Sequence, residues 1–286
     1  MTLSPLSRSP GRRGASPSRR RPHGLVPLLD IDPELGALLD KQRLAAARAE
    51  LGVRVLALTR GEWPGGELRS AGPNHFGLLL VSGALAREVV LEDSISTELL
   101  GPGDLIRPWA PESAADLLNQ RVRWQVLAEA RLGVLNRGFG MSVLRFPEVN
   151  AALLDRLNGR LERLATMKAI AQLNNVDRRL IALFWHLAER WGRVTPDGVV
   201  VPLTLSHRLL GELVGARRPT VSTALAGLAE EGQLVRRDDG AWLLTGEPSG
   251  EPVAKFDRVV SHRRRLVAPP PGDSRLALAS GQEAAN

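Results

Sequence analysis

Polar side chains of two kinds gather in one short segment of the chain. The set consists of Arg217, Arg218, Thr220, Ser222 and Thr223. Guanidinium and hydroxyl groups bind phosphates and the edges of nucleic-acid bases. Pro219 stands among them, and proline is favoured in the first turn of a helix because its missing N–H costs nothing there. The spacing therefore predicts that these side chains project from the start of a helix.

The apolar residues around this segment predict a pair of crossed helices. Leu210, Leu213 and Val214 recur three and four apart, which places them on one face of a first helix. Gly215 follows, where a residue free to adopt the left-handed conformation allows a sharp turn. The second helix, from Arg218 to Glu231, repeats small or apolar side chains at Val221, Ala224, Leu225 and Leu228. A short glycine-containing turn between two helices is typical of DNA-binding helix-turn-helix motifs.

A strand pair after the second helix completes the motif. Residues 233–245 predict a strand, a turn at Asp239-Gly240 and a second strand. Arg236 and Arg237 lie on the approach to that turn, where they can reach a nucleic-acid backbone. Residues 206–246 thus predict a winged helix-turn-helix, with an ordinary pair of packed helices as the alternative.

The charge of the chain is unevenly distributed. Of the net charge of +7, residues 1–24 supply six arginines without an acid and residues 247–286 supply one more positive charge, so that residues 25–246 are neutral. Bulk charge therefore does not identify a DNA-binding face. The local separation of positive and negative residues identifies this face instead. The expected contact side carries Arg217, Arg218, Arg236 and Arg237, and the acidic residues Glu212, Glu230 and Glu231 fall elsewhere.

Composition excludes several kinds of site. The chain has no cysteine, which excludes disulfides, thiolate zinc sites and cysteine-ligated iron–sulfur clusters. No apolar run approaches the length of a membrane span, and the segment after Arg19-Arg20-Arg21 is too short and acidic for an export signal. No two histidines lie at metal-ligand spacing, and no nucleophile–base pair stands out. We expect a cytoplasmic protein that is not an enzyme and contacts no membrane.

The first half of the chain predicts a β-barrel. Short apolar segments alternate with glycine-rich turns, a pattern typical of a sandwich or a jelly-roll barrel. An entry helix is expected at residues 33–50. The candidate strands are Val53–Leu58, His75–Val81, Ala84–Leu91, Ser96–Leu100, Val122–Ala128 and Leu132–Leu135.

Leucines in a long helix predict a dimer interface. Pro147 opens a helix that runs to about Gln172, and within it Leu154, Leu157, Leu161 and Leu164 alternate spacings of three and four, as a coiled-coil seam does. The expected partner is the same helix of a second chain. The alternative is a helix packed only on its own barrel.

The remaining segments divide the chain into five parts. A helix capped by Asn175 or Asp177 and ending at Trp191 and a strand pair around 194–203 precede the helix-turn-helix. We expect a disordered basic tail at 1–24, a barrel domain at 25–146, a dimerisation helix at 147–172, a DNA-binding domain at 173–246 and a flexible tail at 247–286. The fold class is α+β.

This order of parts resembles the Crp/Fnr family of bacterial transcription regulators, which includes the catabolite activator protein and the fumarate–nitrate reduction regulator. The resemblance covers residues 30–246. Its most specific stretches are residues 211–224, residues 76–85, which look like paired strands around a glycine turn, and residues 99–106. It implies a homodimer that binds a pseudo-palindromic site in double-stranded DNA and acts on RNA polymerase.

The barrel departs from family members that bind cyclic nucleotides. The resemblance places Arg107-Pro108 where those members have Gly-Glu, and no Arg-Ser or Arg-Thr pair follows. Arg121 and Arg123 could bind an anion, although structural ion pairs are expected. His75 stands alone, which gives a haem no clear site. We expect no cyclic AMP and no evident cofactor, and the small-molecule effector is unknown.

We predict a homodimeric, sequence-specific DNA-binding transcription regulator. Arg218 is the candidate for guanine, while Arg217 and Thr220 are candidates for phosphates. In the family the position of Pro219 is often a glutamate that reads cytosine, so the base preference is expected to differ. Two alternatives are a ligand-sensing module whose helix-turn-helix binds protein, and a cupin-type barrel enzyme, which the lack of a metal triad disfavours.

Overall fold

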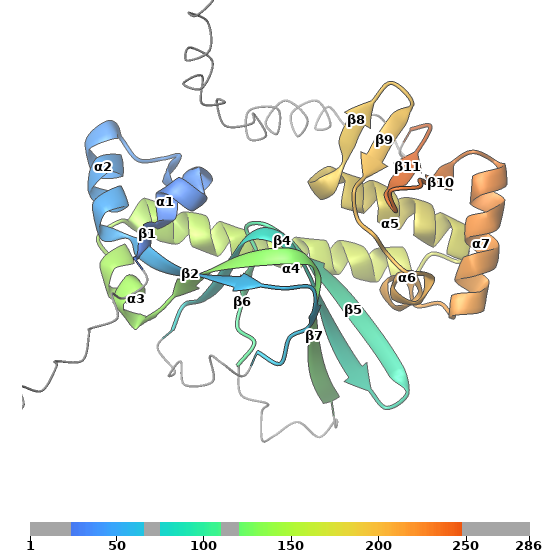
Figure 1. Ribbon diagram of the computed structural model, residues 1–286, viewed down its shortest axis with the longest axis horizontal. Helices are drawn as coiled ribbons and strands as arrows, with labels where there is room; N and C mark the ends of the chain where they lie inside the picture. Colours follow the sequence, from blue (N-terminus) through green and yellow to red (C-terminus); the bar gives the residue numbers. More distant parts are fainter. Residues whose placement is uncertain (1–23, 66–74, 110–119, 248–286) are drawn as a thin grey trace, which may run out of the picture.

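A long helix connects a β-barrel to a smaller domain of helices and short strands (Figure 1). The computed structural model describes residues 24–65, 75–109 and 120–247. The tails expected at 1–24 and 247–286 lie almost wholly outside these residues. No helix in the described ranges has the length and apolarity that crossing a membrane requires.

One antiparallel sheet of seven strands builds the barrel. Its order is β1-β2-β7-β4-β5, with β3 paired to β7 and β6 to β4. The inward side chains form a buried core that includes Leu78, Leu85, Leu132 and an edge-to-face pair of Trp63 and Trp124, whose ring centroids lie 6.1 Å apart. The strands are β1 (Val26–Pro27), β2 (Gly52–Leu58), β3 (Gly61–Glu62), β4 (Gly77–Leu91), β5 (Ser94–Leu100), β6 (Leu105–Ile106) and β7 (Gln120–Leu135).

Two pairs of predicted strands are single long strands in the structure. The strands expected at 75–81 and 84–91 form β4, and those expected at 122–128 and 132–135 form β7. Gly83 does not turn the chain but lies inside β4 with φ +92°, where the register to β7 shifts. A Cβ at Gly83 would lie 2.2 Å from the carbonyl oxygen of Glu129. The glycine is therefore required by a close approach of two strands, a role that a single sequence does not distinguish from a turn.

The single entry helix expected at 33–50 is wrong. The structure has α1 (Leu28–Ile31), a 3₁₀ turn η1 (Pro33–Gly36) and then α2 (Lys41–Glu50). Asp40 starts α2 anew, because its side chain accepts a hydrogen bond from the Arg43 backbone N–H at 2.8 Å. A further helix, α3 (Arg137–Val143), follows β7 and is capped in the same way by Asn136, which accepts from the Phe139 N–H.

The long helix α4 (Pro147–Ala171) lies against the barrel through one face. Val149 and Leu153 are buried in a second apolar cluster, which joins α4 to α1, α3 and strands of the barrel. Further along, Arg156 pairs with Glu34 at 2.5 Å, Arg160 pairs with Glu98, and Arg163 pairs with Asp104. The arginines of this helix thus hold it to its own barrel.

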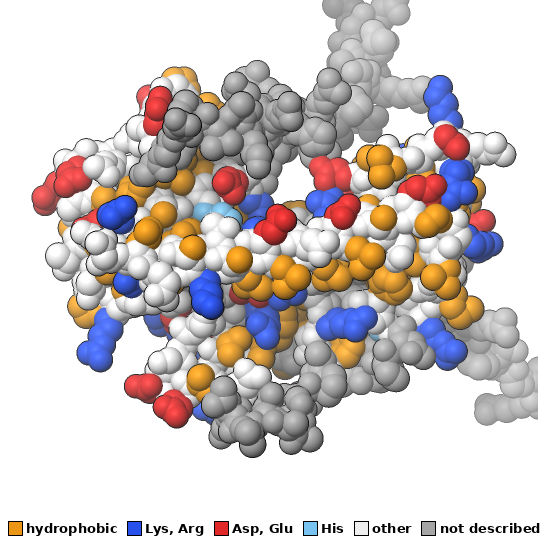
Figure 2. All heavy atoms as spheres, turned by 180° about the vertical axis from the view of Figure 1, so that it is seen from behind, with side chains coloured by type: hydrophobic (Ala, Val, Ile, Leu, Met, Phe, Trp, Pro, Cys, Tyr) orange, Lys and Arg blue, Asp and Glu red, His pale blue; other side chains and the backbone are white. Residues whose placement is uncertain are grey.

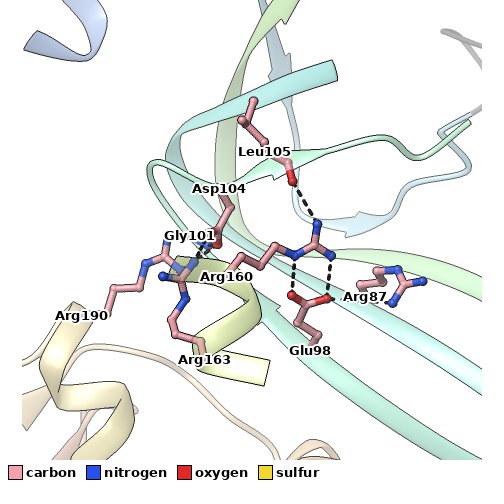
Figure 3. A network of polar contacts seen from close by, with 8 residues as sticks. All are labelled: Arg87, Glu98, Gly101, Asp104, Leu105, Arg160, Arg163 and Arg190. Atoms are coloured by element: carbon pink, nitrogen blue, oxygen red, sulfur yellow. Dashed lines mark hydrogen bonds and ion pairs between the residues drawn. The ribbon is translucent and has the colours of Figure 1, made fainter. Parts of the chain in front are cut away.

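Asp104 is the centre of an ion-pair network that joins three elements (Figure 3). Its carboxylate, which is 1% exposed, accepts from Arg163 of α4, from Arg190 of α5 at 2.7 Å and from the Gly101 N–H at 2.9 Å. Arg190 also donates to the Pro102 carbonyl at 2.6 Å. Burial lowers the pKa of Arg190, and the charge of Asp104 opposes that effect.

The C-terminal domain packs three helices on a small sheet. The sheet order is β10-β11-β9-β8. Phe184 and Trp242, with ring centroids 5.0 Å apart, lie at the centre of its core. The elements are α5 (Val176–Trp191), β8 (Arg193–Thr195), β9 (Gly198–Val201), α6 (His207–Val214), α7 (Arg218–Glu230), β10 (Leu234–Arg236) and β11 (Trp242–Leu244).

The predicted helix-turn-helix is present as α6 and α7. Ser206 caps α6 by accepting from the Leu209 N–H, and Gly215 ends it in the left-handed conformation with φ +65°. Gly211 lies where the turn folds back, since a Cβ there would be 2.5 Å from the Ala216 carbonyl oxygen. Leu210, Val214 and Val221 are fully buried between the helices.

The first helix of the motif also contacts the barrel. Thr97 of β5 donates to Glu212 of α6 at 2.9 Å, and Arg208 of α6 pairs with the same glutamate at 2.9 Å. Burial raises the pKa of Glu212. Glu88 of β4 lies 2.8 Å from Arg123 of β7 and 3.7 Å from Arg208, so the polar contacts of α6 extend across three strands of the barrel, β5, β4 and β7.

A glycine exchange tests the left-handed turn. Gly215→Ala is expected to lower the free energy of unfolding by about 1 kcal/mol, because an L-residue strains in this conformation. No atom within 4 Å would meet the added Cβ, so the effect is conformational alone. The control is Gly227→Ala in α7, where the Cβ also meets nothing and a stabilisation of about 0.5 kcal/mol is expected. Urea titration followed by circular dichroism measures both. Equal effects of the two variants would contradict the assignment.

Candidate nucleic-acid interface

The start of α7 presents a polar, exposed surface. Arg217 is the N-cap residue of the helix, and its side chain and those of Arg218, Pro219 and Thr220 are all exposed. Pro219 occupies the first turn, as the sequence predicts. The N–H groups of a first turn point outward and favour an anion. Two guanidinium groups and a helix N-terminus therefore face solvent together.

Two of the three hydroxyl groups of the set are bound to their own helix. Ser222 donates to the Arg218 carbonyl at 3.1 Å, and Thr223 donates to the Pro219 carbonyl at 3.3 Å. Thr223 is exposed, whereas Ser222 is half-buried. Both hydroxyls lie one helical turn beyond Arg218 and Pro219, and a base edge would have to compete with these local bonds.

The wing brings two further arginines to this end of the domain. Strands β10 and β11 pair antiparallel, and a turn at 237–241 joins them, as predicted. Arg236 lies over the Trp242 ring with its guanidinium carbon 5.7 Å from the centroid, while Arg237 is 3.9 Å from Asp239. Both side chains are exposed.

His207 belongs to the same surface, although sequence reasoning missed it. Its Nδ1 lies 2.9 Å from the Ser222 hydroxyl oxygen, which ties the start of α6 to the start of α7. Burial lowers the pKa of His207, and the positive charges of Arg236 and Arg218 lower it further. Arg218 of α7 and Arg236 of the wing therefore both lie near His207. The only local signal was a histidine next to the Ser206 cap, fifteen residues from its partner.

Comparison with known proteins agrees with this geometry. The family model of the Crp-like helix-turn-helix domain matches residues 178–245. The chain carries a Crp-like helix-turn-helix domain. The resemblance to the Crp/Fnr family that the sequence indicated is confirmed.

Curated relatives match over the same part of the chain. The global nitrogen regulator of Synechococcus elongatus is 28% identical over 89 residues, which are 31% of this chain and 40% of that protein. Its counterpart from Synechocystis is 29% identical over 89 residues, 31% of this chain and 39% of that protein. The chain thus matches about two fifths of the length of these relatives.

Solved structures extend the similarity to the barrel. A cyclic nucleotide-binding domain containing protein from Listeria monocytogenes superposes with a TM-score of 0.56, at 19% identity, over 74% of this chain and 96% of that one. A CooA mutant from Carboxydothermus hydrogenoformans gives 0.53, at 19% identity, over 76% and 88%. FixK2 from Bradyrhizobium japonicum gives 0.52, at 16% identity, over 76% and 98%. These likenesses establish a barrel and a Crp-like domain in one fold.

The leucines that predicted a seam lie on the outer face of α4. Figure 2 shows hydrophobic side chains along this helix, seen from behind. Leu154, Leu157, Leu161 and Leu164 are 52%, 39%, 64% and 37% exposed. The arginines beside them in sequence turn the other way, onto the barrel. One face of the helix packs on its own barrel, and the four leucines stay exposed among the residues that the structure describes. The dimer seam remains a prediction.

Four barrel residues that bear on the question of a ligand site lie within the described part of the chain: Arg107, Arg121, Arg123 and His75. Arg107 follows β6 and donates through Nε to the Phe76 carbonyl at 2.9 Å. Arg123 forms the structural ion pair with Glu88 that the sequence favoured, and Arg121 is exposed on β7. His75 lies edge-on to Trp109, with ring centroids 6.1 Å apart. Most of the downstream region in which the sequence shows no Arg-Ser or Arg-Thr pair, residues 111–123, lies outside the described residues.

The lowered pKa of His207 predicts a pH dependence of stability. Below its ordinary value of 6.5 the unfolded chain takes up a proton that the folded chain resists, so the free energy of unfolding falls as the pH drops from 6.5 toward the lowered pKa. His207→Asn, which cannot titrate, is expected to show a smaller decrease. Urea unfolding at about pH 8 and about pH 5.5 measures both. An identical decrease in the two proteins would show that His207 is not the group responsible.

Proposed function

We propose that this protein is a homodimeric, sequence-specific DNA-binding transcription regulator. The observation that carries the proposal is the exposed N-terminus of α7 on a Crp-like helix-turn-helix domain, with Arg218 of the helix and Arg236 of the wing both near enough to lower the pKa of His207. An α-helix fits the major groove of B-DNA, and its first residues then meet base edges. The division of the chain into barrel, dimerisation helix and DNA-binding domain, at 25–146, 147–172 and 173–246, is part of the proposal.

Phosphate and base contacts divide between the two arginines of the helix. Arg217 is the N-cap, so it lies beside the outward N–H groups that attract a phosphate, and Thr220 adds a hydroxyl. Arg218 is one residue further on and can reach O6 and N7 of guanine. Arg236 and Arg237 on the wing would contact the backbone. Pro219 offers neither donor nor acceptor, so the base opposite it is read by shape alone.

In the proposed dimer, the second chain sets the distance between the two DNA-contacting helices. A second copy of α4 packed on the leucine face would bury the four exposed leucines, and related helices would then place two α7 helices about one DNA turn apart. The resemblance also predicts contact with RNA polymerase and a small-molecule effector whose identity is open.

Selection of DNA sequences tests the groove assignment. The full chain is expected to enrich a pseudo-palindromic site from randomised duplexes, and Arg218→Ala is expected to weaken binding to it by about 1–3 kcal/mol. The matched control is Arg193→Ala on β8, an exposed arginine at the opposite edge of the sheet from the wing. Gel shift measures both. Unchanged specific binding by Arg218→Ala would refute the assignment, and failure to enrich any site would favour the alternative that the motif binds protein.

The oligomeric state tests the leucine face. The wild-type chain is expected to sediment as a dimer, and Leu161→Asp is expected to sediment as a monomer because a carboxylate would be buried in an apolar seam. Leu144→Asp is the control, since Leu144 is 71% exposed and precedes α4. A monomeric wild-type chain, or equal effects of both variants, would contradict a dimer through this face.

A further inference from the structure

A cavity lies at the junction of the barrel, the long helix and the DNA-binding domain. Its volume is about 360 Å³, and its walls come from β4 and β5, from α4, from the end of α5 and from α6. Small-molecule sites in proteins range from about 300 to 1,000 Å³, so the cavity can hold a compact ligand. It lies outside the barrel core, which is filled by side chains such as Trp63 and Trp124.

The polar wall of the cavity carries more positive than negative charge. Arg160 takes both oxygens of Glu98, at 2.6 and 2.8 Å, which leaves Arg87 only a 3.9 Å approach to the same carboxylate (Figure 3). Arg163 and Arg190 likewise share the single carboxylate of Asp104. The network in Figure 3 thus contains four guanidinium groups and two carboxylates. The charged side chains that line the cavity itself are Arg87, Arg163, Lys168 and Arg190 against Glu98 and Glu212, a surplus of two positive charges.

Arg87 is the cation of this network that is least neutralised. It lies on β4, partly buried, and its side chain lines the cavity. Burial lowers the pKa of Arg87, and the nearby charge of Arg160 lowers it further, against the opposing effect of Glu98. A partly desolvated guanidinium attracts an anion more strongly than an exposed one, because less solvent screens the charge.

The other walls of the cavity are apolar. Leu99 and Ile95 come from β5, Met167 comes from α4, and Leu187, Trp191 and Leu213 come from the DNA-binding domain. A small inorganic anion would leave these apolar surfaces in contact with water. A ligand with an apolar part next to its charged group would bury them. The two kinds of wall together specify an amphipathic anion.

We propose that this cavity binds a small carboxylate with an aromatic or branched aliphatic body, its carboxylate at Arg87 and its body between Met167 and Leu187. The walls belong to both the barrel and α6, so such a ligand binds the docked arrangement of the two parts and stabilises it. This goes beyond the proposed function, because binding is measured without DNA.

Titration calorimetry with the full-length chain tests the site. The probe is naphthalene-2-carboxylate, compared with the neutral naphthalene-2-carboxamide. The acid is expected to bind and the amide to bind at least tenfold more weakly. Arg87→Gln is expected to raise the Kd for the acid at least tenfold, Arg87→Lys to restore most of the affinity, and the exposed Arg131→Gln on β7 to change nothing.

A second variant separates the cavity from general surface charge. Met167→Trp leaves Arg87 in place but fills the apolar part of the cavity, and it is expected to abolish binding of the acid. The proposal is overturned by any of three results: no binding of the acid to the wild-type chain, equal binding of acid and amide, or an equal loss in Arg87→Gln and Arg131→Gln. Since none of these titrations contains DNA, their failure is distinct from a failure of Arg218→Ala to affect DNA binding.

Discussion

The buried carboxylate of Asp104 fixes the relation between the three parts of the chain. It follows the Gly101–Gly103 turn of the barrel, and it accepts from α4, from α5 and from the backbone of its own loop. A carboxylate without solvent requires such partners, because an unpaired buried charge costs several kcal/mol. Arg163 and Arg190 must both reach the Asp104 carboxylate, and this fixes the positions of the helices α4 and α5 that carry them. The position of the DNA-binding domain relative to the barrel depends on this constraint.

The recognition surface is built differently, from local geometry. The Gly215 turn, the Ser206 cap and the buried contacts of Val221 set the angle between α6 and α7 without help from the barrel. Polar contacts then join this motif to the barrel, since Thr97 of β5 donates to Glu212 of α6 and Glu88 of β4 lies 3.7 Å from Arg208 of α6. The exposed side chains at the start of α7 are thus held by a rigid domain whose other side is fastened to the sensor-like barrel.

Sequence reasoning succeeded where structure is set by neighbours along the chain. The αL position of Gly215, the place of Pro219 in the first turn, the wing at Asp239-Gly240 and the bounds of α4 all follow from local rules. It failed mainly where distant segments decide, since Gly83 continues a strand because β7 approaches it closely. At the entry helix it missed a local signal, because Asp40 caps α2 and so divides the helix. His207 joined the interface only through a partner in another helix, and the inward direction of Arg156, Arg160 and Arg163 became visible only with the barrel in place.

The two faces of α4 carry different bonds, and this separates two kinds of change. Arginines on one face set the register of the helix on its barrel, while leucines on the other face meet solvent. A helix clamped by ion pairs at three successive turns cannot rotate about its axis without breaking them together. The leucine face can therefore vary in sequence, and so acquire or lose partner chains, while the interior of the subunit keeps its form. Residues that would contact a second chain and residues that hold the helix to its own barrel thus lie on the same helix, and the two sets can evolve independently.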